Sequence, residues 1–309
     1  MKLLTYTTNG NTFRVGILRE NETIVDPGKA YCAKLRQAGQ DRAEELSQAL
    51  LPSESVSFLA NGDFALNAAK EALAFAAEHP DDSYVFKKQD VKIGAPVLRP
   101  SKIVCVGLNY RDHIQEMKRE LPKFPVIFAK YPTAISGPTD PIPLNAHLTQ
   151  KLDYEGELAF VIGKTGKDIP EEQAYHYVAG YCVANDITAR DMQKRTIEWT
   201  QGKTLDGSLP MGYLVTKDEI PDPHKLEIKS MVNGEVRQNS NTSQLVFDVP
   251  KLVSFLSAIF TLEPGDIICT GTPGGVGEAK DIFLKEGDVV TVEIECLGSI
   301  ENKVLDLNK

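Results

Sequence analysis

The sequence of 309 residues predicts an α+β fold, in which a mixed or antiparallel β-sheet carries helices at its periphery. Strand-like segments outnumber helix-like segments after residue 100, and strands and helices do not alternate regularly, which disfavours a doubly wound parallel sheet. The length also suits about two domains. We therefore predict a small N-terminal α+β domain at residues 1–95 and a larger domain at residues 96–309.

The N-terminal region contains signals for two strands and two helices. The expected elements are strands at residues 3–6 and 12–17 and helices at residues 41–50 and 64–79. A turn at residues 9–11 joins the strands, Asn61 or Asp63 is the candidate cap of the second helix, and Pro80 ends that helix. Residues 92–100 contain one glycine and two prolines, which suits a domain boundary or a crossing strand.

The remaining sequence is rich in strands. They are expected at residues 102–106, 126–130, 157–163, 181–184, 226–232, 266–270 and 289–296. Asn233-Gly234 is a strong signal for a hairpin. One helix is predicted to begin after Asp248 and to continue to Ile259, because Asp248 can cap it, Pro250 fits its first turn, and apolar residues follow at helical spacing.

The composition argues against some partners. The chain carries 34 Lys and Arg against 43 Asp and Glu, a net charge of −9, and has no basic patch, so no nucleic-acid partner is expected. No apolar run approaches the roughly 18–20 residues that span a bilayer, and the start lacks the apolar core of a signal peptide, so no membrane partner is expected either. Scattered cysteines predict buried, reduced thiols in a cytoplasmic protein; they are Cys32, Cys105, Cys182, Cys269 and Cys296.

Two glycine-containing motifs do not fit nucleotide binding. Gly202-Lys203-Thr204 is similar to the end of a phosphate-binding loop, but Ile197 stands where that loop needs its first glycine. The glycine-rich segment 271–277 has the wrong spacing for a dinucleotide fingerprint and no apolar helix behind it. It is predicted to be either a tight turn or a loop whose backbone lines a ligand site.

Three carboxylates form the first candidate site. Glu155 and Glu157 are two residues apart, so both lie on one face of an extended strand, and the apolar run from Leu158 leads that strand into a core. Two buried carboxylates repel each other, and a divalent cation would compensate that repulsion. The alternative is a wet strand end where a Lys or Arg pairs with them. Asp186, which follows the strand at residues 181–184, is either the N-cap of a helix or a third oxygen ligand.

A histidine and a glutamate form the second candidate site. His113 and Glu116 are three residues apart, so one helical turn would place them on the same face, where Glu116 could orient the imidazole for drawing a proton from water. The alternative is an exposed polar turn of helix. The remaining histidines have no comparable partner and are predicted to be structural or at the surface; they are His79, His147, His176 and His224.

Five motifs in order resemble those of the fumarylacetoacetate hydrolase family, and the resemblance covers residues 100–305. The motifs are Gly107-Leu108-Asn109-Tyr110 with His113 and Glu116, Tyr154-Glu155-Gly156-Glu157-Leu158, Asn185-Asp186-Ile187-Thr188-Ala189-Arg190-Asp191, Gln201-Gly202-Lys203, and the segment from Pro264 to Pro273. Residues 1–95 are similar to the short leading domain of the family's bacterial members. The spacing of the histidine resembles that of the acylpyruvase and oxaloacetate decarboxylase branch.

The resemblance implies a fold, an assembly and a set of site residues. The family's fold is a mixed β-roll with few helices, and its members are usually homodimers. They use Mg²⁺ or Mn²⁺, and a mobile lid carries the histidine and glutamate dyad. The residues that fall on functional positions of the family are Glu155, Glu157 and Asp186 as metal ligands, His113, Glu116 and Lys203 as catalytic groups, and Arg190, Gln193 and Thr272 as substrate contacts.

The resemblance also implies an activity. We expect hydrolysis of a C–C bond in a fumarylacetoacetate- or acylpyruvate-type dioxo acid through a metal-held enolate, in which His113 takes a proton from water and Lys203 stabilises an oxyanion. The same site would serve oxaloacetate decarboxylation, or isomerisation of a keto–enol pair or a 2-hydroxydienoate. A non-catalytic module that binds an oxo acid is the alternative of another class. The side chains expected to select the substrate are Lys118, Arg119, Lys130 and Tyr131.

Overall fold

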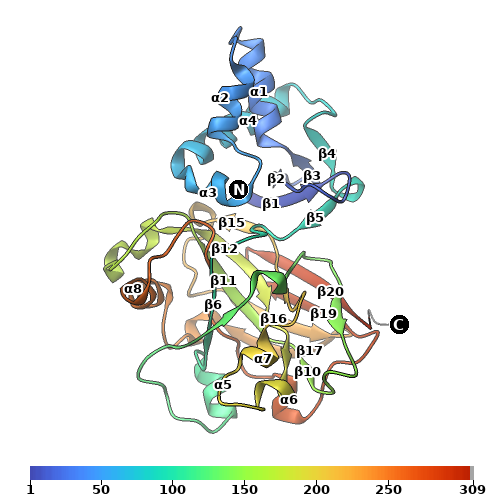
Figure 1. Cartoon of the computed structure of the whole chain (residues 1–309), viewed down its shortest axis with the longest axis vertical. Helices are drawn as coiled ribbons and strands as arrows, with labels where there is room; N and C mark the ends of the chain where they lie inside the picture. Colours follow the sequence, from blue (N-terminus) through green and yellow to red (C-terminus); the bar gives the residue numbers. More distant parts are fainter. Residues whose placement is uncertain (307–309) are drawn as a thin grey trace.

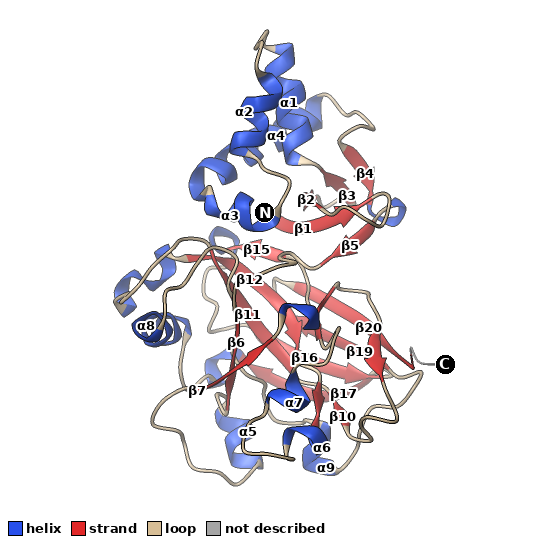
Figure 2. Ribbon diagram, viewed as in Figure 1, coloured by secondary structure: helices blue, strands red, loops and turns tan. Residues whose placement is uncertain are grey.

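The computed structural model describes residues 1–306 and confirms the predicted α+β class (Figure 1). Within these residues, one sheet has eleven strands and another has five, and helices lie at the periphery of both (Figure 2). Most strand pairs are antiparallel, but β6 (Ile103–Gly107) and β18 (Ile267–Cys269) run parallel, as do β9 (Ile142–Leu144) and β20 (Gly298–Asp306). The large sheet is therefore mixed, as predicted.

The N-terminal part is a set of strands covered by helices, which forms the upper lobe in Figure 1. Its strands are β1 (Lys2–Thr7), β2 (Arg14–Leu18), β3 (Thr23–Val25), β4 (Val85–Lys87) and β5 (Lys92–Gly94). Its helices are α1 (Pro27–Gln37), α2 (Ala43–Leu50), α3 (Ser55–Ala60) and α4 (Gly62–Glu78). The helices predicted at residues 41–50 and 64–79 correspond to α2 and α4, and α1 and α3 are additional. Asn61 stands at the N-cap position of α4, as one of the two predictions had it, but its side chain makes no capping hydrogen bond and its amide instead donates to the Ala49 carbonyl at 2.7 Å.

Strand β1 connects the N-terminal strands to the rest of the large sheet. One edge of β1 pairs with β2. The other edge pairs first with β15 (Leu214–Thr216), where Lys2 lies opposite Val215, and then with β5. Residues 92–94 thus form the crossing strand that was one of the two predictions for this segment. Because the sheet runs through both predicted domains, the division at residue 95 remains a prediction.

The centre of the large sheet positions the candidate site. From the N-terminal edge its order is β4, β3, β2, β1, β15, β12 (Val178–Asn185), β11 (Gly156–Ile162), β18, β6 and β7 (Val126–Lys130). All seven residues of β11 are buried, as the apolar run from Leu158 indicates. β11 and β12 pair antiparallel with Gly156 opposite Asn185, so the beginning of one strand and the end of the other meet at the same edge.

The five-stranded sheet packs against the large sheet and closes the core. Its order is β17 (Glu235–Asn241), β16 (Glu227–Val232), β19 (Val289–Ile294), β20 and β9. The predicted hairpin joins β16 to β17, and Asn233 and Gly234 both have positive φ (52° and 79°), as a tight two-residue turn requires. Leu158 of β11 and Val183 of β12 share one apolar cluster with Val292 of β19, so the core lies between the two sheets.

Short elements surround this core. The two-stranded pairs are β8 (Ile135–Ser136) with β14 (Leu209–Pro210) and β10 (Leu152–Asp153) with β13 (Thr188–Ala189). The helices are α5 (Arg111–Glu116), α6 (Arg190–Gln193), α7 (Thr200–Lys203), α8 (Val249–Ile259) and α9 (Gly277–Lys280). Helix α8 is the predicted one, and the Asp248 carboxylate accepts the Lys251 N–H at 3.0 Å as its cap.

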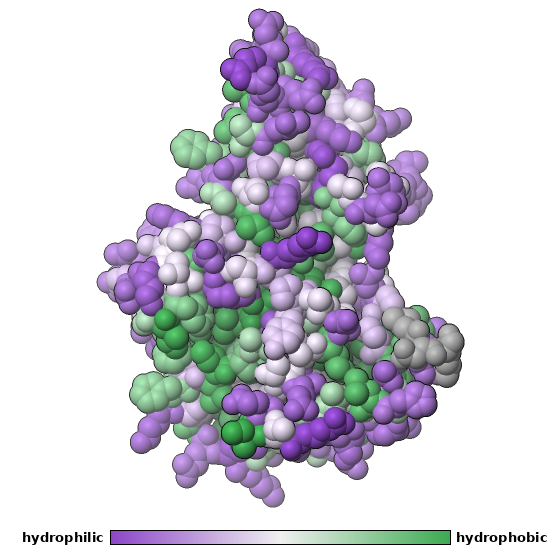
Figure 3. Space-filling model, viewed as in Figure 1, coloured by the Kyte–Doolittle hydropathy of each residue, from purple (hydrophilic) through white to green (hydrophobic). Residues whose placement is uncertain are grey.

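The cysteine prediction is correct for the central strands and wrong elsewhere. Cys105, Cys182 and Cys269 are buried on β6, β12 and β18, whereas Cys32 is only half-buried. Cys296 is exposed, because β19 ends at Ile294 and this residue lies in the following turn with a φ of 64°. None of the helices within residues 1–306 is long and apolar enough to cross a bilayer. On the face shown in Figure 3, hydrophilic residues cover most of the upper lobe.

Candidate active site

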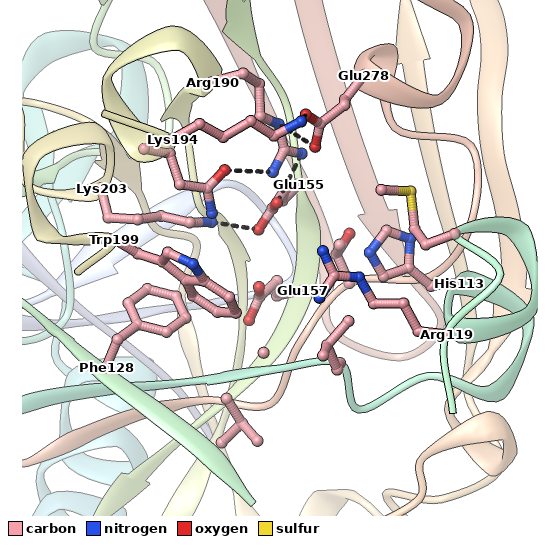
Figure 4. Close-up of a pocket in the computed structure, with 16 residues that line it drawn as sticks. His113, Arg119, Phe128, Glu155, Glu157, Arg190, Lys194, Trp199, Lys203 and Glu278 are labelled. Carbon is pink, nitrogen blue, oxygen red and sulfur yellow. Dashed lines mark hydrogen bonds and ion pairs between the residues drawn. The ribbon is translucent and has the colours of Figure 1, made fainter. Parts of the chain in front are cut away.

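A cavity of about 130 Å³ lies where the first residues of β11 meet the short helices α5, α6 and α7. Most of the predicted site residues line it: His113, Glu155, Glu157, Arg190, Gln193, Lys203 and Thr272. Figure 4 shows Glu155 between Arg190 and Lys203, with His113 and Arg119 on the opposite side. The fold therefore brings five separate sequence motifs to one place.

The three predicted metal ligands converge beside this cavity. Glu155 precedes β11, Glu157 is its second residue, and the Asp186 N–H donates to the Glu155 carbonyl at 2.8 Å. One carboxylate oxygen from each residue lies within 4.8 Å of the others, and all three side chains are buried. Asp186 follows β12, but the bridge strand β13 separates it from helix α6, so the alternative prediction of a helix N-cap is wrong.

Buried cations pair with two of these carboxylates. Lys203 Nζ lies 2.6 Å from Glu155 and 2.7 Å from Asp186, and Lys130 Nζ lies 2.7 Å from the other Asp186 oxygen. Arg190 Nη2 is 2.7 Å from Glu155. Burial alone would raise the pKa of Glu155, but the charges of Lys203 and Arg190 outweigh it and lower that pKa to about 2. The alternative prediction of a solvent-exposed strand end is therefore correct about the basic partners but wrong about the exposure, because these side chains are buried.

Glu157 differs from its two neighbours. Its carboxylate accepts the Gly271 N–H at 2.8 Å, and no basic side chain within residues 1–306 lies at ion-pair distance from it. Burial raises its pKa well above the ordinary value, and the charges of Asp186 and Glu155 raise it further. Glu157 is thus a buried carboxylate without a cationic partner, and a hard divalent cation held by the oxygens of Glu155, Glu157 and Asp186 would supply that partner.

Helix α7 presents Lys203 to the carboxylates. Gly202 is required here, because a Cβ would lie 2.5 Å from the Ala189 carbonyl oxygen and from the Gln193 nitrogen. Lys203 also lies over the Phe128 ring, 5.1 Å from its centroid, and Trp199 packs edge-on against that ring at 5.5 Å. Sequence analysis did not identify these two aromatic residues, although the chain's single tryptophan stands beside the Gly-Lys motif.

The predicted dyad lies on helix α5. His113 Nδ1 is 3.7 Å from Glu116 Oε2 and makes no hydrogen bond within the described part of the chain. Burial is the largest influence on the His113 pKa and lowers it, and Arg190 acts in the same direction against the opposing effect of Glu155 and Glu116. The imidazole is therefore neutral at neutral pH and can accept a proton. The alternative of an exposed helical turn is wrong for His113, whose side chain is only 12% exposed.

The three predicted substrate contacts lie at the cavity, but polar atoms of each already make hydrogen bonds within the protein. The Arg190 guanidinium donates to the Asp153 carboxylate at 2.8 Å and to the Gln193 side-chain oxygen Oε1 at 3.2 Å. The Thr272 hydroxyl donates to the Gly156 carbonyl at 2.9 Å and accepts from Gln238 at 2.8 Å. Asp153 and Gln238 were not identified from the sequence, since nothing in their local pattern distinguishes them.

The residues predicted to select the substrate separate into two groups. Arg119 lines the cavity, whereas Lys118 and Tyr131 do not. Lys130 is buried beneath the carboxylates, where it pairs with Asp186 and is not at the far end of the cavity.

Known proteins resemble this chain along its length. The family of the fumarylacetoacetate (FAA) hydrolase C-terminal domain matches residues 102–305. The chain is 41% identical to oxaloacetate tautomerase YisK of Bacillus subtilis (strain 168) over 303 residues, which cover 95% of this chain and 97% of that protein. It is 46% identical to the mitochondrial oxaloacetate tautomerase fahd2 of Xenopus laevis over 260 residues, which cover 82% and 79% of the two chains.

Two solved structures share the fold. Fumarylacetoacetate hydrolase from Exiguobacterium antarcticum superposes with a TM-score of 0.79 at 35% identity, and 99% of each chain is covered. Maleylpyruvate hydrolase from Sphingobium sp. SYK-6, in a complex with manganese(II) and pyruvate, superposes with a TM-score of 0.74 at 28% identity, again with 99% of each chain covered.

Proposed function

This chain is an enzyme of the fumarylacetoacetate hydrolase family, and we propose that it catalyses the keto–enol tautomerisation of oxaloacetate with a bound Mg²⁺ or Mn²⁺ ion. The observation that carries this proposal is the neutral base His113 facing a cluster of three carboxylates and Lys203 across one small cavity. Relatives more than 40% identical bear the name oxaloacetate tautomerase, which favours this reaction among those open to the site.

The side chains have separate tasks in this proposal. Glu155, Glu157 and Asp186 would hold the metal ion, which when bound withdraws electrons from the 2-oxo group of the substrate and so acidifies the neighbouring carbon. His113 would accept a proton from that carbon of the keto form and return it to the enol form, while Glu116 orients the imidazole. Lys203 would place positive charge beside the reacting oxygen. For each proton that His113 takes from the carbon, the enol oxygen would gain one from water and His113 would release one to water. The reverse direction runs the same transfers backward, so the reaction is balanced without another reactant.

The size of the cavity supports a small acid. At about 130 Å³ it is close to the cavity of about 150 Å³ that holds benzene, and well below the roughly 300–1,000 Å³ of drug-sized pockets. Oxaloacetate, a four-carbon acid with one oxo group and two carboxylates, suits such a cavity better than a long acylpyruvate.

C–C bond hydrolysis is the second candidate function. It is favoured by the structural similarity to a maleylpyruvate hydrolase that contains manganese(II) and pyruvate. In hydrolysis, His113 would take a proton from a water molecule as that water attacks the distal carbonyl, and the products would be two acids.

The predicted homodimer and the cytoplasmic location also remain proposals, and sedimentation velocity would test the homodimer.

One assay series separates these reactions. Enol oxaloacetate is added to the protein with Mg²⁺ and, in parallel, with a chelator, and the loss of enol absorbance is followed together with pyruvate formation. We expect fast, chelator-sensitive loss of the enol without pyruvate. Pyruvate from oxaloacetate would instead indicate decarboxylation, and pyruvate from an acylpyruvate would indicate hydrolysis. Metal-dependent binding of the acid without any turnover would instead support the alternative of a non-catalytic module that binds an oxo acid.

Arg119 is predicted to bind the distal carboxylate of the substrate. The other basic residues that line the cavity pair with protein carboxylates: Lys203 with Glu155, Arg190 with Asp153, and Lys194 with Glu278. The Arg119 guanidinium has no such partner within residues 1–306 and points into the cavity beside His113 (Figure 4).

Replacing Arg119 with methionine should therefore raise KM for oxaloacetate about 10–100-fold, since a charge-assisted hydrogen bond contributes roughly 1.5–3 kcal/mol. KM for acetylpyruvate, which has one carboxylate, should hardly change. Lys118→Met is the control, because the neighbouring lysine is exposed and does not line the cavity. Equal effects of Arg119→Met on both substrates would contradict this role.

A further inference from the structure

Helix α5, which carries His113, is attached to the rest of the protein by two carboxylates one turn apart. The Asp112 carboxylate accepts the Ser240 hydroxyl at 2.5 Å and has a longer contact with the Gly274 N–H at 3.4 Å. The Glu116 carboxylate accepts the Gly275 N–H at 3.0 Å. A helix of six residues is not stable by itself, so such contacts decide where α5 lies.

Ser240 belongs to β17 of the five-stranded sheet. Another residue of the same strand makes hydrogen bonds on the opposite side of the site. Gln238, two residues earlier and on the same face, donates to the Thr272 hydroxyl and to the Pro273 carbonyl, both at 2.8 Å. The Gln238 side-chain oxygen Oε1 accepts the Gly156 N–H at 3.0 Å, between Glu155 and Glu157. One strand therefore contacts both the carboxylate strand and the helix that carries the base.

A β-bulge gives these two side chains their direction. The register between β16 and β17 shifts between Ser230 and Met231, so that Arg237 is an extra residue on β17. Before the bulge, Val236 is 53% exposed, whereas Gln238 after it is fully buried. The loop after β18, which contains Gly275, also packs tightly on the bulge, since a Cβ on Gly275 would lie 2.1 Å from the Arg237 backbone carbonyl oxygen.

We propose that Ser240 and Asp112 form a positioning pair that holds helix α5, and with it His113, at the distance from the carboxylate cluster that proton transfer requires. The hydroxyl-to-carboxylate hydrogen bond is charge-assisted and links residues 128 positions apart in the sequence. Neither residue lines the cavity, so the pair acts on the reaction through the placement of the imidazole.

The test compares Ser240→Ala with Ser243→Ala, an exposed serine three residues along the chain. In the full-length protein, we expect Ser240→Ala to speed amide hydrogen exchange at residues 111–117 and to lower kcat about 10–100-fold with KM and metal affinity little changed. Asp112→Asn should act in the same direction, and the double variant should be no worse than the more severe single variant. Ser240→Thr, which keeps the hydroxyl, should restore both quantities.

Two results would overturn the proposal. One is an exchange rate in Ser240→Ala equal to that in Ser243→Ala, and the other is faster exchange with an unchanged kcat. The kinetic part rests on the proposed tautomerase function, but the exchange part does not. Failure of that function would appear as absent turnover in the wild type while the exchange difference persists.

Discussion

Replacing Glu157 with glutamine is expected to abolish metal-dependent turnover and, in the metal-free protein, to raise thermal stability. Glutamine keeps the shape of the side chain but removes an anionic ligand, so turnover should fall about 10³-fold or more. The thermal midpoint of the wild type should rise when Mg²⁺ or Mn²⁺ is added, because the ion binds only the folded state, and that of the variant should not.

The gain in metal-free stability follows from the raised pKa of Glu157. Below the ordinary pKa of a glutamate, the carboxyl is protonated in both the folded and the unfolded chain. As pH rises, the unfolded chain releases its proton first, because burial and the charges of Asp186 and Glu155 raise the pKa in the folded state. The carboxyl therefore destabilises the metal-free wild type at neutral pH. The difference in thermal stability between Glu157→Gln and the wild type should narrow as pH falls toward about 5.

Glu172→Gln is the matched control, because this glutamate is exposed on the surface. The thermal midpoint of this variant in the presence of chelator, and its increase when metal is added, should match those of the wild type. A Glu157→Gln variant that is still stabilised by the metal would show that this carboxylate is not a ligand.

Replacing His113 with alanine is expected to lower kcat about 10²–10⁴-fold, which is the usual contribution of a positioned general base. The stabilisation by metal should remain, since His113 is not one of the three clustered carboxylates. His147→Ala is the control, because that histidine is exposed and lies away from the cavity. Full activity in His113→Ala would assign the proton transfer to another group.

The pH dependence provides a second check of the same role. Burial lowers the pKa of His113, so the imidazole is already neutral at neutral pH and becomes protonated only in acid. Wild-type kcat should therefore be level around neutral pH and fall as the pH drops through this lowered pKa. The acid limb should be missing from the residual activity of His113→Ala.

The sequence predicts the clustered carboxylates better than their surroundings. The two-residue spacing of Glu155 and Glu157 places both on one face of a strand, and the following apolar run shows that the strand is buried. The position of Lys130 could not be predicted, because its pairing with Asp186 depends on packing between β7 and the end of β12, 56 residues apart. Gln238 was missed for the same reason, since its three partners come from β11 and from the loop after β18.

The pattern of buried residues explains why helix α1 of the N-terminal part was not predicted. Helix α1 begins with Asp26 as its cap and Pro27 in its first turn, which is a recognisable start. Only Pro27 and Ala30 of this helix are buried, so it has no apolar stripe to reveal it. Helix α4, by contrast, buries a row of alanines at helical spacing and was predicted at nearly its full length.

The pairing of β1 with β15 has a consequence for synthesis of the chain. The strands of residues 2–94 pair locally and can form as soon as they leave the ribosome, but Lys2 and Leu3 wait for Val215 and Leu214. Until then a short backbone edge is open to pairing with other nascent chains, and β5 shields only its neighbouring half at Thr5–Thr7. The nascent protein thus passes through a long interval in which an early-folded lobe depends on late residues for protection from aggregation.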